Sequence, residues 1–284
     1  MKTCLVVEGG GMKCAYSAGI LDRMLDEKIT FDECIWVSAG AANLVSFIAG
    51  QRGRNIKFYV DYPKLPKYCG AWQWITTGHY FNLHYIYGEL SNDGGASPVD
   101  YDAYVKNPTQ LLITATDAKT GEAKYFTKDD IKRNDLTVIK AGAALPALSR
   151  AIKVNGRKYF DGGVADSIPL QKAFDEGCDR IVLILENARS FFRQPQAHKF
   201  LYHLMLWKYP AVIKGVDTRH LRYRECLKWV YEMEKAGKVF IFAPPENTGI
   251  STSTIDFPKL QKLYETGLAD YDARSKEMKE YLKE

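Results

Sequence analysis

The sequence predicts an α/β fold, a three-layer α/β/α sandwich with a mostly parallel central sheet. Short apolar runs alternate along the chain with longer segments of helical periodicity, beginning with "TCLVVE" at 3–8 and the periodic segment at 13–28. Such alternation is typical of strand–helix–strand units whose helices cover both faces of a parallel sheet. A length of 284 residues, 46% of them hydrophobic, suits one large domain with a substantial core.

The first half of the chain supplies three of the expected strands. The apolar run at 3–8 is stopped by glycines, and a second strand at 34–37 leads into an alanine-rich helix at 39–51. The run "QLLITATD" at 110–117 is a third strand. We expect residues 123–127 to be its hairpin partner across the short "AKTGE" segment.

The second half continues the alternation. A hairpin spans 151–163 around an Asn-Gly turn pair. The helix at 169–177 begins with proline and ends with glycine, which is the usual asymmetry of helix ends. The apolar runs at 180–185 and 238–244 are expected to be buried strands.

We expect residues 1–284 to form a single domain in which two segments interrupt the alternation. An aromatic-rich insertion covers about 59–104, and a basic aromatic segment covers about 189–230. The charged tail from Phe257 is expected to be an amphipathic helix, broken or kinked near Gly267.

The positive charge of the chain is concentrated. Residues 189–238 contain eleven Lys and Arg against four Asp and Glu, a local charge of +7, so the remainder of the +5 chain sums to −2. A basic stretch can attract anionic lipid headgroups or nucleic acid, and the alternative is a solvated helical face. We expect no nucleic-acid partner.

Cysteine usage and hydropathy predict a cytoplasmic protein, one that can make peripheral contact with a membrane surface. The six cysteines include no C-x-x-C pair and no zinc spacing with histidine, as expected for reduced thiols. The apolar run at the start is too short for a signal peptide, and no stretch of about 18 apolar residues is long enough to span a bilayer.

The loop "EGGGMK" at 8–13 can hold an anion. Its glycines let backbone N–H groups converge on one point, and the start of a helix adds positive potential. The anion is a phosphate or the oxyanion of ester hydrolysis. A nucleotide-binding protein is one interpretation, but no G-K-[ST] follows and the pattern G-x-G-x-x-G fails at Cys14; a tight strand-to-helix turn is the structural alternative.

The stretch "IWVSAGA" at 35–41 resembles a nucleophile elbow with one different residue. Ser38 lies between a strand and an alanine-rich helix, where a serine would project from the carboxyl edge of the sheet. Gly40 fits the pattern G-x-S-x-G, whereas Trp36 takes the place of its first glycine. The alternative is a serine that caps a helix N-terminus.

A candidate base lies far along the chain. Asp161 follows a hairpin strand and precedes Gly162 and Gly163. Taken alone, this pattern favours a turn residue or an Asx cap, and Asp161 becomes a candidate base only beside the other two motifs. None of the five histidines lies at the end of a predicted strand, and the late histidine of an α/β-hydrolase triad is not evident. The sequence therefore favours a serine activated by an aspartate alone.

In this interpretation the residues perform an acyl transfer. Asp161 would accept the hydroxyl proton as Ser38 attacks an acyl carbonyl. Amides around Gly10 and Gly11 would hold the oxyanion, and each such donor is typically worth ~3 kcal/mol of barrier.

These three pieces, in this order, resemble the patatin-like phospholipase family, specifically its bacterial cytoplasmic branch. The resemblance runs from Met1 nearly to the end of the chain and implies a patatin-like α/β/α sandwich, a Ser-Asp dyad and no metal or cofactor. It also implies hydrolysis of acyl esters, with phospholipids as the typical substrate. The matching residues are Gly9-Gly10-Gly11-Met12-Lys13, Ser38-Ala39-Gly40 and Asp161-Gly162-Gly163.

By this resemblance each matched position acquires a role. Ser38 would be the nucleophile of a lipase or phospholipase A type enzyme, and Asp161 would be its base. The oxyanion donors would come from Gly9, Gly10, Gly11 and Met12, and Lys13, Gly40, Gly162 and Gly163 would support the motifs.

Two positions depart from the family pattern, in which both are normally glycine. Cys14 closes the glycine-rich loop, and Trp36 opens the elbow. An indole at the elbow must find space, and a shift of about 1 Å in the nucleophile can cost about 10²-fold in rate. The alternative function is therefore a catalytically impaired, patatin-like lipid-binding protein. If the enzyme is active, we expect Trp36→Gly to leave its activity equal or higher.

The expected partner is a phospholipid or another acyl-ester lipid, which the protein must reach. The two aromatic segments suggest how it makes that contact. Aromatic side chains among basic residues suit the headgroup layer of a membrane, and burial in the core is the alternative. The expected cap over the serine comprises Trp72, Trp74, Tyr80, Phe81, Tyr85 and Tyr87. The expected membrane contact comprises Phe191, Phe192, Leu204, Met205, Trp207 and Tyr209.

Overall fold

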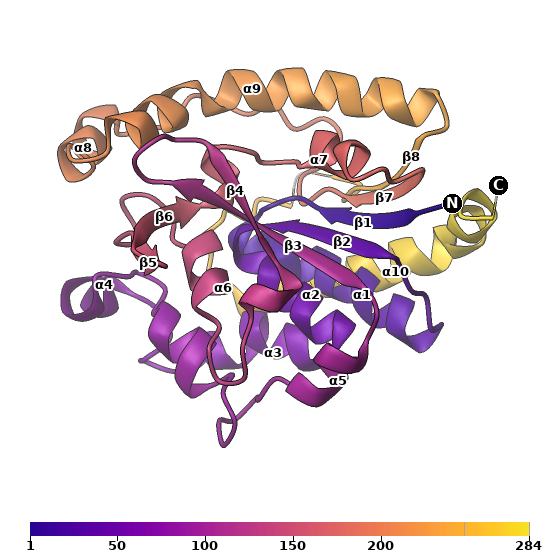
Figure 1. Ribbon diagram of the computed structural model, residues 1–284, viewed down its shortest axis with the longest axis horizontal. Coiled ribbons are helices and arrows are strands. Elements are labelled where there is room, and N and C mark those ends of the chain that lie inside the picture. The colour runs from indigo at the N-terminus through magenta and orange to yellow at the C-terminus, as the bar shows by residue number, and fades with distance from the viewer. Residues whose placement is uncertain (247, 284) are drawn as a thin grey trace.

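The computed structural model describes residues 1–246 and 248–283 and is built on a central sheet (Figure 1). Its strands, in chain order, are β1 (Thr3–Val7), β2 (Glu33–Val37), β3 (Gln110–Asp117), β4 (Ala123–Thr127), β5 (Ile152–Val154), β6 (Arg157–Asp161), β7 (Arg180–Ile184) and β8 (Val239–Phe242). Their spatial order is β5-β6-β3-β2-β1-β7-β8, and β4 pairs with β3. The run from β3 to β8 is parallel, and β4, β5 and β6 form antiparallel pairs. The predicted α/β class with a mostly parallel sheet is confirmed.

Helices cover both faces of the sheet (Figure 1). One face carries α1 (Ala15–Asp26), α2 (Ala41–Ile48), α3 (Arg54–Val60), α5 (Tyr101–Lys106), α6 (Thr137–Gly142) and α10 (Phe257–Tyr281), and the other carries α7 (Leu170–Asp175) and the long α9 (Pro210–Lys235). The helices α4 (Ala71–Thr77) and α8 (Lys199–Met205) lie at the end of the molecule nearest β5. Short 3₁₀ helices occur at Gly11–Cys14, Ser38–Gly40, Tyr62–Lys64, Lys128–Asp130 and Gly162–Val164, and a π-helical turn at Tyr85–Glu89.

The alternation of side chains along each strand explains the two layers of helices. On β1, Leu5 and Val7 pack with α1, α2 and α10, whereas Cys4 and Val6 pack with α7 and α9. Successive side chains of a strand point to opposite faces, so a strand covered on both faces reads as a continuous apolar run. This is why the sequence pattern identified these strands.

The predicted break in the C-terminal helix is wrong. Helix α10 runs without interruption from Phe257 to Tyr281 and packs along α1. A Cβ atom on Gly267 would lie 2.1 Å from the Tyr16 carbonyl oxygen, and one on Gly19 would lie 2.2 Å from the Tyr264 carbonyl oxygen. The glycine serves the close approach of two helices, which a single-segment sequence pattern does not reveal.

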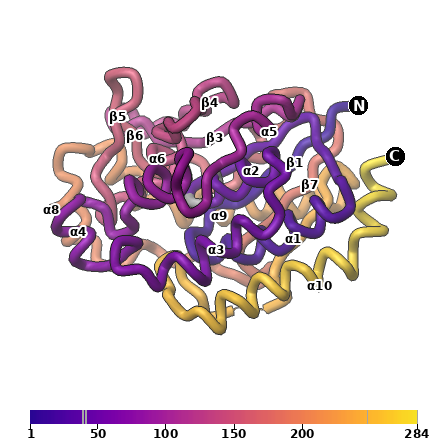
Figure 2. The backbone as a smooth tube through the Cα atoms, turned by 90° about the horizontal axis from the view of Figure 1, so that it is seen from below, coloured from indigo at the N-terminus to yellow at the C-terminus, as the bar shows by residue number. Residues whose placement is uncertain are grey.

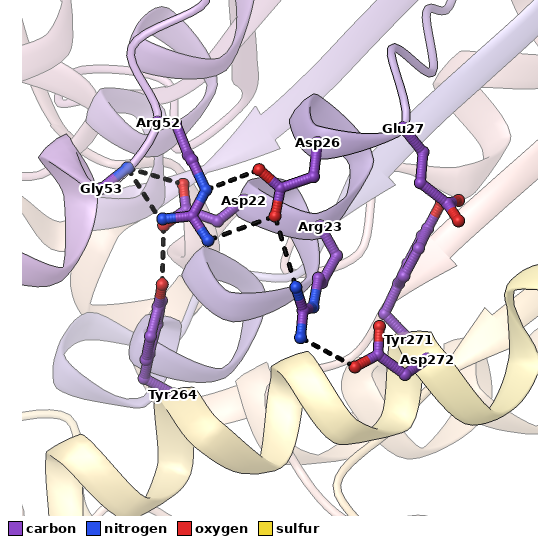
Figure 3. Close-up of polar contacts among 9 residues, drawn as sticks. All are labelled: Asp22, Arg23, Asp26, Glu27, Arg52, Gly53, Tyr264, Tyr271 and Asp272. Atoms are coloured by element: carbon purple, nitrogen blue, oxygen red, sulfur yellow. Dashed lines mark hydrogen bonds and ion pairs between the residues drawn. The ribbon is translucent and has the colours of Figure 1, made fainter.

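Polar contacts hold α10 against α1 (Figure 3). The Tyr264 hydroxyl donates to Asp22 Oδ2 at 2.8 Å, and Arg23 Nη2 donates to Asp272 Oδ2 at 2.9 Å. Strand β8, which precedes α10, extends the same sheet beside β7. We therefore propose that the N- and C-terminal parts form one domain.

Within the described residues, no helix combines the length and apolar character that crossing a bilayer requires.

Candidate active site

The register of the sheet brings two of the predicted segments together at the carboxyl ends of β1 and β2. Val7 of β1 lies opposite Trp36 of β2, so two residues further along each strand Gly9 comes level with Ser38. A Cβ atom on Gly9 would lie 3.0 Å from the Cβ of Ser38. The glycine-rich loop therefore passes directly beside the elbow.

The third predicted segment, which contains Asp161, lies on the other side of β3. Val37 pairs with Thr114 of β3, and the next residue of β3, Ala115, pairs with Asp161 at the end of β6. Ser38 and Asp161 thus lie at the same height on either side of β3. Ligands in parallel sheets bind outside the carboxyl ends of the strands, where these groups converge.

Ser38 has the geometry of a nucleophile on a sharp turn. Its φ is +67°, a left-handed conformation that is uncommon outside glycine and is often found at functional sites. The side chain is nearly buried, and its Oγ donates a hydrogen bond to Asp161 Oδ2 at 2.5 Å. A strand, a strained turn and a helix are the context of a nucleophile elbow.

Asp161 is fixed so that one carboxylate oxygen faces Ser38. Its Oδ1 accepts the Gly163 amide at 2.8 Å, and its backbone carbonyl accepts the Thr116 hydroxyl at 2.7 Å. Burial raises the pKa of Asp161 above its ordinary value, against the opposing effects of the Arg219 charge and of the hydrogen bonds from Ser38 and Gly163. A raised pKa strengthens a carboxylate as a general base near neutral pH.

The glycine-rich loop turns sharply into α1. Gly11 has φ +58° and packs against Thr252, whose carbonyl accepts the Met12 amide at 3.0 Å. The Gly10 amide is directed at the Cys14 sulfur. Among the described residues, no backbone carbonyl accepts the amide of Gly10 or Gly11. Of the four predicted oxyanion positions, Met12 thus has its amide engaged by a carbonyl, and Gly10 has its amide directed at a buried sulfur.

An apolar pocket opens beside Ser38. Most of its wall comes from α2, α3 and the aromatic-rich insertion. The lining residues are Gly11, Met12, Ser38, Ala42, Asn43, Phe58, Tyr59, Tyr68, Phe81, Leu83, Ile86, Tyr87, Ala143 and Leu145. The mostly apolar lining of this pocket suits a hydrocarbon chain.

Comparison with known families agrees with this geometry. The model of the patatin-like phospholipase family matches residues 5–174, a stretch that contains the glycine loop, Ser38 and Asp161. The chain belongs to this family. A second family model, described as a domain of unknown function (DUF6363), matches residues 209–283, which include α9, β8 and α10 in full.

Two individual proteins resemble this patatin-like chain. The uncharacterized protein YjjU of Escherichia coli K12 is 24% identical over 275 residues, which cover 94% of this chain and 75% of YjjU. The crystal structure of VipD from Legionella pneumophila aligns with a TM-score of 0.45 at 12% identity, covering 96% of this chain and 67% of that one.

The structure explains how this patatin-like elbow accommodates Trp36. The indole is fully buried on the face of the sheet covered by α1, α2 and α10, and it occupies the space beside Gly40. A Cβ atom on Gly40 would lie 1.3 Å from Cζ2 of Trp36. The large residue at the first elbow position is therefore matched by the absence of a side chain at the second. Trp36 is part of the core, so its replacement by glycine would leave a cavity, and the expected gain in activity must be weighed against that loss.

Cys14, the other departure, is also accommodated. Its side chain is fully buried against Glu186, and burial raises the pKa of the thiol well above its usual value. Its carbonyl accepts the hydroxyl of Ser17 at 3.0 Å and the side-chain amide of Asn43 at 3.1 Å. Cys14 is thus a neutral, inert core residue in the helix that follows the loop.

The remaining motif glycines also stand where a side chain would collide. A Cβ atom on Gly162 would lie 2.3 Å from the Thr114 carbonyl oxygen. One on Gly163 would lie 2.5 Å from Nη2 of Arg219 and 3.0 Å from Oδ1 of Asp161. The absence of side chains at Gly162 and Gly163 keeps Asp161 close to β3 and to Arg219.

Glu8 anchors the glycine loop from behind. Its carboxylate accepts hydrogen bonds from the Tyr223 hydroxyl (2.7 Å), the Asn187 side-chain amide (2.7 Å) and the Glu186 backbone amide (2.8 Å). These contacts join the end of β1 to the loop after β7 and to α9. Lys13, a predicted motif residue, donates to Asn187 Oδ1 at 2.6 Å. Sequence reasoning missed this network because its members are far apart along the chain.

The predicted aromatic cap is only partly at the serine. Phe81 and Tyr87 line the apolar pocket, whereas Trp72 and Trp74 on α4 are 70% and 41% exposed and lie outside it. Among the described residues that line the two hollows beside Ser38, there is no histidine. Within the described residues, no group of three His, Cys, Asp or Glu side chains is placed to hold a metal.

A second hollow adjoins Ser38, and sequence reasoning missed its two arginines as site residues. We call it the basic pocket, and part of it opens to solvent. Arg193 comes from the loop before α8 and Arg219 from α9, both within the basic segment that the charge pattern had singled out. The lining residues are Gly9, Gly10, Gly11, Lys13, Ser38, Leu145, Asn187, Phe191, Phe192, Arg193, Gln194, Gln196, Arg219, Ser251 and Thr252.

Proposed function

We propose that this chain is a serine acyl hydrolase of the lipase or phospholipase A type, which cleaves acyl esters of lipids through Ser38 and Asp161. The observation that carries the proposal is the 2.5 Å contact between Ser38 Oγ and Asp161 Oδ2, made by a serine in a left-handed turn. The contact lies at the mouth of an apolar pocket and beside a glycine-rich loop. Family membership supports the same chemistry.

In the acylation step, Ser38 Oγ attacks the ester carbonyl and its proton passes to Asp161 Oδ2. The negative charge that develops on the carbonyl oxygen is stabilised by the amides of Gly10 and Gly11. Among the described residues no backbone carbonyl accepts the Gly11 amide, whereas the Gly10 amide must turn away from the Cys14 sulfur to reach the oxyanion. Collapse of the tetrahedral intermediate expels the alcohol, which takes the proton from Asp161.

Deacylation repeats these steps with water. Asp161 accepts a proton from the attacking water, and the hydroxide equivalent adds to the acyl group on Ser38. The second intermediate releases the fatty acid, and Ser38 Oγ recovers the proton from Asp161. No group other than the ester and water is consumed.

The alternative function is a lipid-binding protein with an impaired elbow. It was suggested by Trp36, but the fit between that indole and Gly40 removes the steric reason for impairment. The short contact between Ser38 and Asp161 therefore favours the hydrolase.

The surface around α4 and α8 supports peripheral contact with a membrane. The two helices lie at the same end of the molecule (Figures 1 and 2), and Trp74, Ile75, Met205 and Leu206 line a common groove between them. Exposed apolar side chains of this size, near lysines, suit the interfacial layer of a bilayer. The exposed fractions are 70% for Trp72, 64% for Ile75, 83% for Phe200, 61% for Leu204 and 69% for Trp207. The six cysteines are free thiols, which is in keeping with a cytoplasmic location.

Hydrolysis of a short-chain acyl ester tests the proposal. We expect Ser38→Ala and Asp161→Asn each to lower kcat/KM by at least about 10³-fold, because nucleophile and base act as one unit. Ser190→Ala and Asp175→Asn make the same chemical changes at exposed positions and should retain wild-type rates. Undiminished hydrolysis by Ser38→Ala would refute the assignment, and rapid lipid binding without any turnover of wild type would favour the alternative.

A further inference from the structure

A groove runs between α4 and α8, at the end of the molecule that also carries the β5–β6 hairpin (Figures 1 and 2). We call it the α4–α8 groove; one wall is Trp74 and Ile75 of α4, and the other is Met205 and Leu206 at the end of α8. Its volume of about 590 Å³ lies in the usual range of small-molecule sites. None of its described lining residues lines either hollow at Ser38, so the groove is a separate site.

The apolar lining of the α4–α8 groove is held in place by contacts within the protein. Phe160 of β6 is buried and meets the Tyr209 ring edge to face, with the ring centres 5.1 Å apart. Trp74 Nε1 donates to the Ala147 carbonyl at 3.2 Å, so the polar edge of the indole is satisfied and its rings remain for apolar contact. Trp74 and Ile75 are both exposed to solvent. Large apolar side chains that are exposed in a concave surface favour the binding of a hydrocarbon group.

The β5–β6 hairpin adds positive charge to this apolar groove. Arg150, which precedes β5, and Lys158 of β6 both line the groove, and none of its described lining residues is an Asp or Glu. Lys153 of β5 lies directly opposite Lys158 in the register of the hairpin, so the two side chains project from the same face of the sheet. Three cations are therefore gathered beside the apolar walls.

The protein does not neutralise this charge itself. Within the part of the chain that the structure describes, no ion pair within 4.0 Å involves Arg150, Lys153 or Lys158. Like charges that lie directly opposite on two strands are destabilising, so Lys153 and Lys158 repel each other. A Cβ atom on Gly78 would lie 2.4 Å from Arg150 Nε, so the Arg150 side chain lies against the end of α4. A carboxylate beside this guanidinium would accept two parallel hydrogen bonds and reduce the repulsion.

We propose that the α4–α8 groove binds a long-chain fatty-acid anion, with its carboxylate at Arg150 and Lys158 and its hydrocarbon chain between the two helices. Apolar walls, two cations and a lining without acidic residues match a ligand that combines one long apolar chain with one negative charge. A bilayer surface is broad and meets the outer faces of α4 and α8, whereas a concave groove can surround a single chain. A fatty acid is also the product of the proposed hydrolase, but binding in this groove uses neither Ser38 nor Asp161.

Calorimetric titration with dodecanoate below its micelle concentration tests the site. We expect wild type and Ser38→Ala to bind dodecanoate equally, whether or not the protein is a hydrolase. Arg150→Gln should bind it about tenfold more weakly, because a hydrogen bond to a charged group is lost, and Arg150→Lys should retain most of the affinity. Lys106→Gln removes one charge from an exposed position on α5 and should leave the affinity unchanged. Absence of binding by wild type, or equal binding by Arg150→Gln, would overturn the proposal, as would a loss of binding in Ser38→Ala, which would place the fatty acid at the nucleophile.

Further ligands separate the contribution of the chain from that of the charge. Each methylene buried in the groove should tighten binding by up to about fourfold, so octanoate should bind at least about tenfold more weakly than dodecanoate. Ile75→Ser, at an exposed position in the wall, should reduce this difference. Dodecanol has no charge and should bind equally to wild type and Arg150→Gln; an equal loss of dodecanol and dodecanoate binding would show that Arg150 only maintains the groove, and would overturn the proposal. Cosedimentation with anionic vesicles that falls in Arg150→Gln while dodecanoate binding is unchanged would assign the cations to a bilayer surface and overturn it as well.

Discussion

Gly40→Ala tests the fit between the two unusual elbow positions. The backbone of Gly40 is helical, with φ −69° and ψ −11°, so alanine is compatible with it. Its Cβ, however, would lie 1.3 Å from Cζ2 and 1.6 Å from Cε2 of the Trp36 indole, which is fully buried. The ring must therefore leave its position in the core, or the start of α2 must move away from β2.

The expected magnitude follows from two opposing terms. Replacing a helical glycine by alanine gains roughly 0.5–1 kcal/mol, whereas overpacking a core costs typically about 1–3 kcal/mol. The overlap is complete, so we place the cost at the upper end and expect a net loss of about 2 kcal/mol. In a chain of 284 residues that lowers Tm by about 3–4 °C.

Removal of the Trp36 indole should reverse the sign of the stability change that Gly40→Ala causes. Trp36→Gly alone should destabilise the protein by about 3–5 kcal/mol, because it leaves a large cavity. This replaces the expectation from sequence that the variant would simply equal or exceed wild-type activity. In the Trp36→Gly background, adding Gly40→Ala should cost nothing or stabilise by up to about 1 kcal/mol.

Thermal and urea unfolding of the four proteins in this cycle provide the assay. The coupling between the two positions should be at least about 2 kcal/mol. If Gly40→Ala costs the same with and without the indole, the steric explanation of the elbow is incorrect.

Three further predictions concern the chemistry and the surface. Activity (kcat/KM) should fall as the pH is lowered through the pKa of Asp161, because the protonated carboxyl cannot accept the Ser38 proton. Burial raises that pKa, so the fall should occur above the ordinary aspartate value of about 4, and a fall at or below that value would contradict the assigned base. Arg219→Gln should move the fall to higher pH, because the Arg219 charge lowers that pKa, whereas Arg219→Lys should leave it nearly in place. Trp72→Ser and Leu204→Ser should each weaken cosedimentation with anionic vesicles by about tenfold while leaving hydrolysis of a soluble ester intact, and equal cosedimentation would exclude this surface.

The sequence predicted most strands and the residues of the candidate site, but it did not predict how the helices contact one another. Strands such as 3–8 and 34–37 were identifiable because burial on both faces makes them continuously apolar. Ser38 and Asp161 were found because glycines mark the turns that hold them. The contact between Ser38 and Asp161 follows from the register of β2 and β6 against β3. The sequence implied this contact only through the resemblance to the family, whose motifs occur in the same order.

What the sequence could not predict are consequences of packing. Gly267 was interpreted as a helix breaker, although it allows α10 to approach α1. The complementarity between Trp36 and Gly40 depends on which way an indole points. Arg193 and Arg219 belong to a charge run that resembles a solvated helical face, and only the folded chain brings them beside Ser38.

Covalent labelling with a fluorophosphonate probe tests the central claim most directly, since the probe reacts with an activated serine. Mass spectrometry of labelled wild-type protein should locate a single adduct at Ser38. Ser38→Ala should remain unlabelled, and Asp161→Asn should react far more slowly. Wild-type protein that stays unmodified, or an adduct that persists in Ser38→Ala, would contradict a nucleophile activated by the aspartate across β3.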